Sequence, residues 1–208
     1  MGKAAAQVTT IGACAAVLPG YSMGSAMEHN PEGSHQVVLS RHLKQGEPYQ
    51  YRPGDEFRLT PGGRDASRYE VGVGDVLFMS RGTRNLAWEI GRVPEPSLAL
   101  VSFYILRPGP GVTPGYLAWY LNHPRTQASI GQIRTGAGTP IVQRAAFTEL
   151  AVTLPPPDVQ RTIAALDGLM AREHELSTLR ADAGARLNQY RNELILRHLD
   201  GGETRNHG

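Results

Sequence analysis

The C-terminal part of the chain contains a long segment without proline. No proline occurs from Asp158 to Leu199, and apolar residues recur there at intervals of three and four. They stand at positions 159, 163, 166, 170, 176, 179, 183, 187, 190 and 194, with one break near Arg172 and Glu173. This spacing is typical of a long amphipathic helix with a coiled-coil-like seam. At 1.5 Å per residue such a helix would span about 60 Å.

A helix of this length cannot bury its whole apolar stripe against one small domain. Part of the stripe therefore requires a partner, most simply a second copy of the chain or a helix of another subunit. The residues expected to make these contacts are Ile163, Leu166, Met170, Leu176, Leu179, Leu187, Tyr190 and Leu194. The alternative is a hairpin of two shorter helices that bends at Gly168 or Gly184. The polar residues 200–208 are expected to form a disordered tail.

The preceding residues have a different character, because glycine or proline interrupts them every few positions. Short apolar runs rich in β-branched and aromatic residues predict strands at 36–39, 75–79, 98–106 and 150–154. Residues 113–133 predict a helix with Thr113 as N-cap, interrupted near Pro124. The prolines of LPPPDVQ then separate this part from the long helix, for which Asp158 is the expected N-cap.

These patterns predict an α+β protein. A mixed, mainly β domain is expected at 1–157 and one long helix at 158–199. The composition, 40% hydrophobic and 19% charged residues, fits a globular chain. No apolar run approaches the roughly 20 residues of a membrane helix, so we expect no membrane contact and a cytoplasmic location.

Motifs for catalysis are largely absent. The single cysteine, Cys14, excludes an internal disulfide and a multi-cysteine zinc site, and its apolar neighbours favour a buried structural role. VGVGDV lacks the third glycine of a dinucleotide-binding fingerprint, no P-loop occurs, and the seven histidines show no ligand spacing. We therefore expect a binding module without catalytic residues, metal or cofactor of its own. A hydrolase that uses Cys14 or Ser80 is the weaker alternative, since no His–Asp partner is evident.

The basic residues are almost all arginine. Of 21 basic residues only Lys3 and Lys44 are lysines. Arginine suits bidentate recognition of phosphates and guanine edges, although a codon bias would produce the same composition.

Three segments, taken in order, resemble the specificity (S) subunit of type I restriction-modification systems. They are TIGACAAVLPGYSMGSAMEHNPEGSHQVVLSRHL, VGVGDVLFMSRGTRNLAW, and the stretch from YLAWYLNHP through RTGAGTP to LPPPDVQRTIAALD. The resemblance covers about residues 8–199 and corresponds to half of such a subunit, with one target-recognition domain and one spacer helix. A usual member carries two of each. Arg84 and Asn85 also depart from the family pattern, in which many relatives have a small residue and glycine.

The resemblance implies a non-catalytic DNA-binding subunit that reads one half of a bipartite site on double-stranded DNA. It also implies methyltransferase subunits as partners, with S-adenosylmethionine bound by those partners, and an endonuclease subunit as a further candidate partner. A homodimer joined through the long helix would read an interrupted palindrome. The alternative is a stand-alone DNA-binding or regulatory module of another phage-defence system.

Candidate DNA-contacting residues fall into three groups. The first loop offers Arg81, Thr83, Arg84 and Asn85, and the second offers Arg134, Thr135, Thr139, Gln143 and Arg144. Tyr21, Ser22 and Arg41, at expected strand ends, form the third group. Arg and Asn side chains can read guanine and adenine edges in the major groove. The alternatives are an internal ion pair from Arg81 to Asp75, and a structural turn for the second loop.

Overall fold

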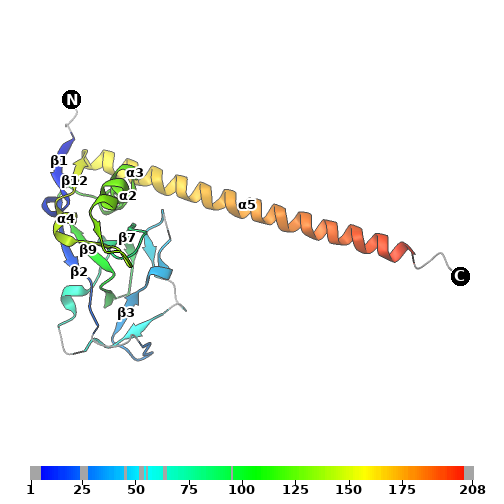
Figure 1. The fold of residues 1–208 in the computed structure, drawn as a ribbon, viewed down its shortest axis with the longest axis horizontal. Coiled ribbons are helices and arrows are strands. Elements are labelled where there is room, and N and C mark those ends of the chain that lie inside the picture. The colour runs from blue at the N-terminus through cyan, green and yellow to red at the C-terminus, as the bar shows by residue number, and fades with distance from the viewer. Residues whose placement is uncertain are drawn as a thin grey trace. The chain divides into compact units, whose positions relative to one another are not determined.

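The computed structural model describes residues 6–23, 28–44, 46–51, 54, 56–62, 65–94 and 96–203, with side chains up to residue 198. The chain forms two compact units, residues 1–168 and residues 169–208. The first unit combines sheets with short helices, and α5 (Pro157–Glu203) contributes its first turns to it (Figure 1). The predicted α+β class is confirmed.

The described residues of the first unit contain a five-stranded sheet in the order β2-β9-β6-β7-β4. Its strands are β2 (Ala15–Pro19), β9 (Phe103–Pro108), β6 (Val76–Met79), β7 (Ala87–Arg92) and β4 (Tyr49–Gln50). β9 pairs antiparallel with both β2 and β6, and β7 pairs antiparallel with β6. The predicted strand at 75–79 thus lies in the middle of this sheet.

A smaller sheet has the order β5-β3-β8, with β5 (Arg58–Leu59), β3 (His35–Val38) and β8 (Ser97–Ala99). Two further strand pairs join β1 (Gln7–Thr10) to β12 (Ala151–Leu154), and β10 (Arg134–Thr135) to β11 (Ile141–Val142). The helices are α1 (Ile11–Cys14), α2 (Pro114–Asn122), α3 (Pro124–Gln132) and α4 (Arg144–Thr148), with 3-10 turns at Ser40–His42 (η1) and Ser67–Tyr69 (η2).

The predicted single strand at 98–106 is wrong, because this run divides between the two sheets. β8 ends at Ala99, and a turn closed by the Phe103 N–H, which donates to Leu100 O at 2.8 Å, leads into β9. Tyr21 occupies the gap through backbone hydrogen bonds to Ala99 and Val101. The split could not be read from the apolar run, because it depends on this distant segment. Gly20 permits the contact, since a Cβ there would lie 2.0 Å from Leu100 O.

The central strand β6 is buried on both faces. Val76 and Phe78 belong to a core cluster that also includes Leu117 and Leu121 of α2, whereas Leu77 belongs to the cluster on the opposite face. Alternate side chains of a strand point to opposite faces, so the unbroken apolar run fits a strand covered on both sides. The second cluster also contains Trp88, Ile90, Phe103 and Ile105.

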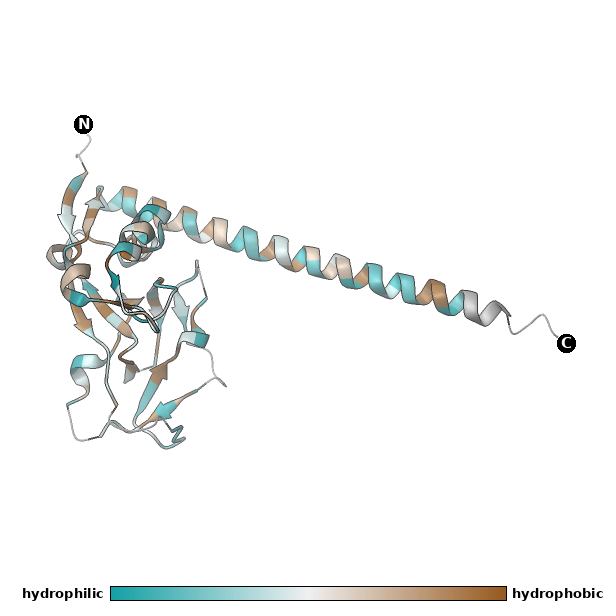
Figure 2. Ribbon diagram, in the orientation of Figure 1, coloured by the Kyte–Doolittle hydropathy of each residue, from teal (hydrophilic) through white to brown (hydrophobic). Residues whose placement is uncertain are grey.

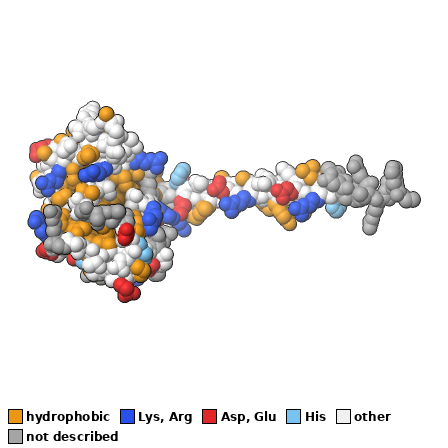
Figure 3. Space-filling model, turned by 60° about the horizontal axis from the view of Figure 1, so that its bottom comes forward, with side chains coloured by type: hydrophobic (Ala, Val, Ile, Leu, Met, Phe, Trp, Pro, Cys, Tyr) orange, Lys and Arg blue, Asp and Glu red, His pale blue; other side chains and the backbone are white. Residues whose placement is uncertain are grey.

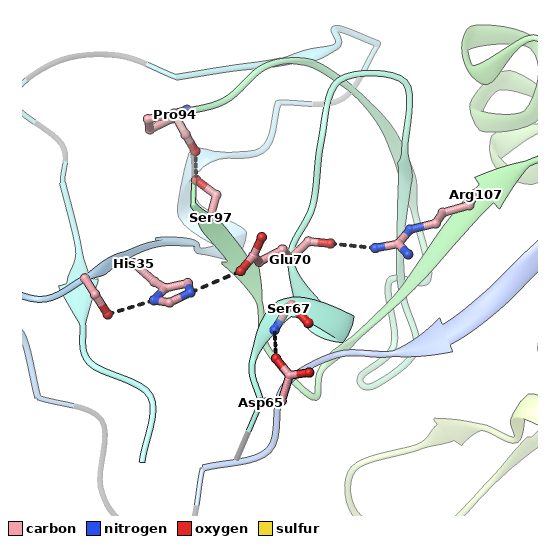
Figure 4. A network of polar contacts seen from close by, with 8 residues as sticks. His35, Asp65, Ser67, Glu70, Pro94, Ser97 and Arg107 are labelled. Carbon is pink, nitrogen blue, oxygen red and sulfur yellow. Dashed lines mark hydrogen bonds and ion pairs between the residues drawn. The ribbon is translucent and has the colours of Figure 1, made fainter. Parts of the chain in front are cut away.

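A polar network joins the two sheets (Figure 4). His35 Nε2 of β3 lies 3.3 Å from Glu70 Oε1, and Arg107 Nη2 of β9 donates to Glu70 O at 3.0 Å. Arg107 Nε also lies 3.8 Å from Asp75 Oδ1. Glu70 therefore contacts residues of both sheets.

The region around 113–133 forms two helices, with the interruption at the predicted proline. Thr113 is the N-cap residue of α2, and His123 is the N-cap of α3, where its Nδ1 accepts from the Arg125 N–H. Asp158, by contrast, is not the N-cap of α5, because the helix begins one residue earlier at Pro157. Proline is favoured in the first helical turn, and an acidic residue there stabilises the helix N-terminus.

Gln160 connects the start of α5 to the loop before α2. Its side chain is fully buried, and its Oε1 accepts from the Thr113 N–H at 2.8 Å. Its Nε2 donates to Gly111 O at 2.8 Å and to Pro155 O at 2.7 Å. The side chain therefore satisfies backbone groups both in the loop before α2 and at Pro155, just before α5.

α5 is a single helix of 47 residues, about 70 Å at 1.5 Å per residue. It continues through Gly168 and Gly184, so the hairpin alternative is wrong: glycine weakens a helix but keeps its backbone donor. Figure 2 shows apolar residues recurring along its length. The helix also includes 200–203, which corrects part of the expected tail, and 204–208 lie outside the described residues.

We predict that Gln160→Leu lowers the free energy of unfolding by about 3 kcal/mol, because buried backbone groups lose their partners. Urea unfolding followed by circular dichroism measures this change. The exposed neighbour provides the control: Arg161→Gln is expected to stay within about 0.5 kcal/mol of the original chain. Equal unfolding midpoints for the two variants would contradict the bridging role of Gln160.

Candidate nucleic-acid interface

The two predicted loops form one continuous surface. The Gly82 N–H donates to Pro140 O at 2.8 Å, and the Val142 N–H donates to Ser80 O at 2.8 Å. Between these bonds Arg81 and Ile141 form an isolated antiparallel bridge. The loop that follows β6, residues 80–85, is therefore paired with the β10–β11 hairpin. We call these two segments together the recognition surface.

The recognition surface rests on β9 and the turn before it. The Ser80 N–H and Oγ both donate to Ser102 O, at 2.8 and 3.0 Å, and the Tyr104 hydroxyl donates to Val142 O at 2.6 Å. Burial raises the pKa of Tyr104, and the positive charges of Arg144 and Arg81 oppose that rise. Both guanidiniums therefore act on the same hydroxyl, although Arg81 lies in the loop after β6 and Arg144 begins α4.

Asn85 supports the loop from inside. Its side chain is only 2% exposed, and its Nδ2 donates to Met79 O at 2.9 Å. Gln127 of α3 donates to Asn85 O at 2.7 Å and to Leu121 O at 2.6 Å. This placement corrects the expectation that Asn85 contacts DNA. The signal in the sequence was the turn itself, since asparagine side chains often bond to nearby backbone.

The other candidates of the first loop lie at the surface. Arg81, Thr83 and Arg84 are exposed, and Gly82 has φ of 95°, a conformation that glycine adopts without strain. Arg134, from the hairpin, is half-buried and donates from Nη1 to Thr83 O at 3.0 Å. Arg134 therefore joins the two loops while it adds positive charge to the surface.

The remaining candidates of the second group are exposed. They are Thr135 and Thr139 in the hairpin, and Gln143 and Arg144 at the start of α4. Gln143 Nε2 donates to Thr135 Oγ1 at 3.2 Å, so the hairpin and the residue before α4 are linked through their side chains. The hairpin therefore forms part of the surface and is not a turn hidden beneath the helix.

The third group of candidates does not join this arrangement. Tyr21 is 5% exposed, packs edge-on against Tyr69 at 5.5 Å, and its hydroxyl donates to Gly62 O at 3.4 Å. Its expected role at the surface is corrected to one in the core, because an aromatic ring beside the sheet is favoured inside. Ser22 and Arg41 are exposed, but they lie outside the two loops.

The alternative ion pair between Arg81 and Asp75 is not found among the described residues. Asp75 instead accepts from the Gly72 N–H at 3.0 Å and lies 3.8 Å from Arg107. Burial raises the pKa of Asp75, and these two neighbours oppose the rise. The Arg81 guanidinium is thus exposed at the recognition surface.

On one face of the structure the basic side chains are spread out and not gathered into one patch. Figure 3 shows one face of the structure, where Lys and Arg side chains stand at separate positions among hydrophobic and neutral atoms. The formal charge of the chain is only +2. Binding of an anion on such a surface would rely on individually placed guanidiniums more than on a broad electrostatic field.

The alternative nucleophiles have structural environments. Cys14 is buried, and burial raises the pKa of its thiol, which disfavours the reactive thiolate. The Ser80 hydroxyl is also buried and donates to the backbone of Ser102. Within the described residues, no group of three or more His, Cys, Asp and Glu side chains is placed to hold a metal ion. Nor does any helix of this described part combine the length and apolar character of a membrane span.

No protein-family model and no curated protein matches this sequence. Solved structures do match. One, from work on complex assembly and conformational transition of the type I R-M system, has a TM-score of 0.66 at 15% identity, with 91% of this chain and 44% of that chain covered. The HsdS subunit from Thermoanaerobacter tengcongensis has a TM-score of 0.56 at 16% identity, with coverage of 87% and 40%.

The S subunit of a type I restriction-modification system from M. genitalium has a TM-score of 0.52 at 14% identity, with coverage of 85% and 41%. At these identities the likeness concerns the fold. This chain therefore has the fold of a type I specificity subunit, over less than half the length of the chains it matches. The predicted resemblance is confirmed at this level, with one mixed unit of sheets and short helices followed by one long helix.

We predict opposite behaviour for the neighbouring residues Arg84 and Asn85. Asn85→Ala should lower the free energy of unfolding by about 2 kcal/mol, since Met79 O would lose its buried donor. Arg84→Ala should change it by less than about 0.5 kcal/mol, because the side chain is exposed. Urea unfolding of both variants measures the difference. Similar free energies of unfolding would contradict the supporting role of Asn85 and the surface position of Arg84.

Proposed function

We propose that the chain is a DNA-binding specificity subunit of a type I restriction-modification complex and that it recognises one half of a bipartite DNA site. The observation that carries this proposal is the joined recognition surface. It presents Arg81 and Arg84 on a backbone held by hydrogen bonds between two distant segments, and Arg144 follows the hairpin at the start of α4. The likeness of the fold to type I specificity subunits supports the assignment.

The chemistry of the surface suits the major groove of DNA. A guanidinium can donate two hydrogen bonds to guanine O6 and N7 or grip a phosphate, and a glutamine such as Gln143 can pair with adenine. Thr135 and Gln143 are already oriented by their mutual hydrogen bond. Because the supporting backbone is fixed, little backbone conformational entropy is lost when these side chains bind, and the remaining cost is the ordering of the side chains themselves.

The proposal includes a homodimer formed through α5. Its apolar side chains are well exposed in the single chain, with Leu176 at 51%, Leu187 at 68% and Tyr190 at 60%. Leu176, Leu179 and Ala183 repeat as Leu187, Tyr190 and Leu194, an interval of eleven residues. This interval gives 3.67 residues per turn, slightly more than the 3.6 of a straight α-helix, and favours a slight right-handed supercoil. A two-fold dimer would place two recognition surfaces on an interrupted palindrome.

The catalytic work belongs to partners in this proposal. The chain recruits methyltransferase subunits, which bind S-adenosylmethionine, and an endonuclease subunit joins where the complex also cleaves DNA. A structure of a type I R-M system in the comparisons concerns complex assembly, which supports this view. Light scattering of the chain with a methyltransferase subunit tests it. A chain that binds DNA but takes up no methyltransferase would instead be a stand-alone defence module.

For DNA binding, we predict that Arg84→Ala costs about 1–3 kcal/mol on the cognate site and relaxes one base position. The site is first obtained by selection from random duplexes, and affinities are then measured by fluorescence anisotropy at several salt concentrations. Arg161→Ala, outside both loops, is the control and should bind within about twofold of the original chain. An equal loss on every sequence would assign Arg84 to a phosphate contact. Undiminished binding would refute its role.

For assembly, we predict that Leu187→Glu converts the dimer to a monomer, because the introduced charge would be buried in the seam. Asn192→Glu adds the same charge on the other side of α5 and should leave the dimer intact. Sedimentation equilibrium compares the two variants. Loss of the dimer in both would mean that general charge repulsion, not the apolar stripe, is responsible.

A further inference from the structure

A cavity of about 150 Å³ lies among residues 46–48, the start of β7, α2 and the first turns of α5. All of its lining residues belong to the unit 1–168, and none belongs to the recognition surface. A cavity of this size can hold a group as large as benzene. It is smaller than the roughly 300–1,000 Å³ of drug-sized ligand pockets. The space therefore suits a single side chain or a small organic ion.

Small residues on the two helices create this space. Gly115 and Ala118 of α2 line it together with Ala164 and Gly168 of α5. A Cβ at position 115 would lie 2.9 Å from Glu89 Oε2 and 3.1 Å from the Cβ of Ala164. Gly115 thus leaves room for the Glu89 carboxylate at the point where α2 approaches α5.

The cavity contains carboxylates without donors. Glu89 of β7 and Asp167 of α5 line it, with Glu47 from the preceding segment, and none of the lining residues is Lys or Arg. Within the described part of the chain, neither Glu89 nor Asp167 has a hydrogen-bond or ion-pair partner. Burial raises the pKa of both groups. A cation that entered the cavity would supply the missing charge and donors.

The walls of the cavity are aromatic as well as acidic. Trp88 and Trp119 line it, and they are the two tryptophans of the chain. The Trp88 ring packs in the core cluster on the face of the sheet away from α2, and its Nε1 donates to Lys44 O at 2.8 Å. Trp119 packs against Tyr116 and His123, each at 5.4 Å between ring centroids. Indole rings attract cations, and a planar guanidinium can also stack on them.

We infer that this cavity is a binding site for the guanidinium group of an arginine side chain presented by a protein partner. Carboxylates repel phosphate, so the cavity is unsuited to the DNA that we assign to the recognition surface. A guanidinium is favoured over an ammonium because its plane can stack on an indole ring such as that of Trp119 and its fork matches a carboxylate. The inference does not depend on the proposed DNA binding, since none of its residues belongs to that surface.

The intrinsic fluorescence of the chain reports on this site directly, because both tryptophans line it. Titration with butylguanidinium should give a saturable change, whereas butylurea, which has a similar shape without charge, should give none. Butylammonium should bind more weakly than butylguanidinium. The tripeptide acetyl-Gly-Arg-Gly-amide should bind, and its norleucine analogue should not.

Variants locate the site. Glu89→Gln and Asp167→Asn keep the size of the side chain but remove the charge, and each should weaken butylguanidinium binding at least tenfold. Glu149→Gln, an exposed residue outside the cavity, is the matched control and should bind like the original chain. Circular dichroism and DNA binding of each variant separate a local effect from a loss of folding.

Several results would overturn the inference. They are the absence of a saturable change with butylguanidinium, an equal response to butylurea, and unchanged affinity in both folded carboxylate variants. Binding of butylguanidinium without binding of the arginine tripeptide would refute a protein ligand and indicate a small guanidinium compound. Because DNA binding is measured separately, failure of this site and failure of the proposed function are distinguishable.

Discussion

Burial of β6 on both faces is the constraint on which the rest of the first unit depends. Val76 and Phe78 face one core cluster and Leu77 faces the other, so helices and strands must cover this strand on both sides. The strand then ends at a fixed point, where Ser80 bonds to Ser102. The first loop begins directly at this anchored residue. Its position is therefore determined by the packing of the core.

The recognition surface shows how adjacent residues can serve opposite purposes. Arg84 is exposed, while Asn85 beside it is buried and bonded to Met79. Arg134 links the two loops through Thr83 O and still contributes its charge. Hydrogen bonds between the two segments hold the backbone of this surface in place. In the function proposed above, the surface would be a rigid support whose exposed side chains contact DNA.

In our interpretation, positive and negative side chains of the first unit serve two different binding sites. Arginines occupy the two joined loops, whereas Glu89 and Asp167 occupy the cavity beside α2 and α5. The two sites would attract ligands of opposite sign and so would not compete. The exposed stripe of α5 is a third kind of surface, apolar and regular, and it suits a helix of a second copy. The loops are thus basic, the cavity is acidic and the stripe of α5 is apolar.

Local signals in the sequence determined much of this protein. The spacing of apolar residues and the absence of proline predicted α5, because helical spacing is a property of consecutive residues. Pro124 correctly predicted the division between α2 and α3. The short run at 75–79 likewise predicted a strand. The two loops were identified by their arginines and glycines. What remained undetermined was which of their side chains would face outward.

Those decisions depended on contacts between distant segments. Tyr21 divides the run at 98–106, Gln127 supports Asn85 from 42 residues away, and the hairpin pairs with the loop near Arg81. Burial is a property of the whole packed unit, so Asn85 and Tyr21 could not be assigned to the interior from their neighbours alone. The cavity arises in the same way, since residues 46–48, β7, α2 and α5 meet there only in the folded chain.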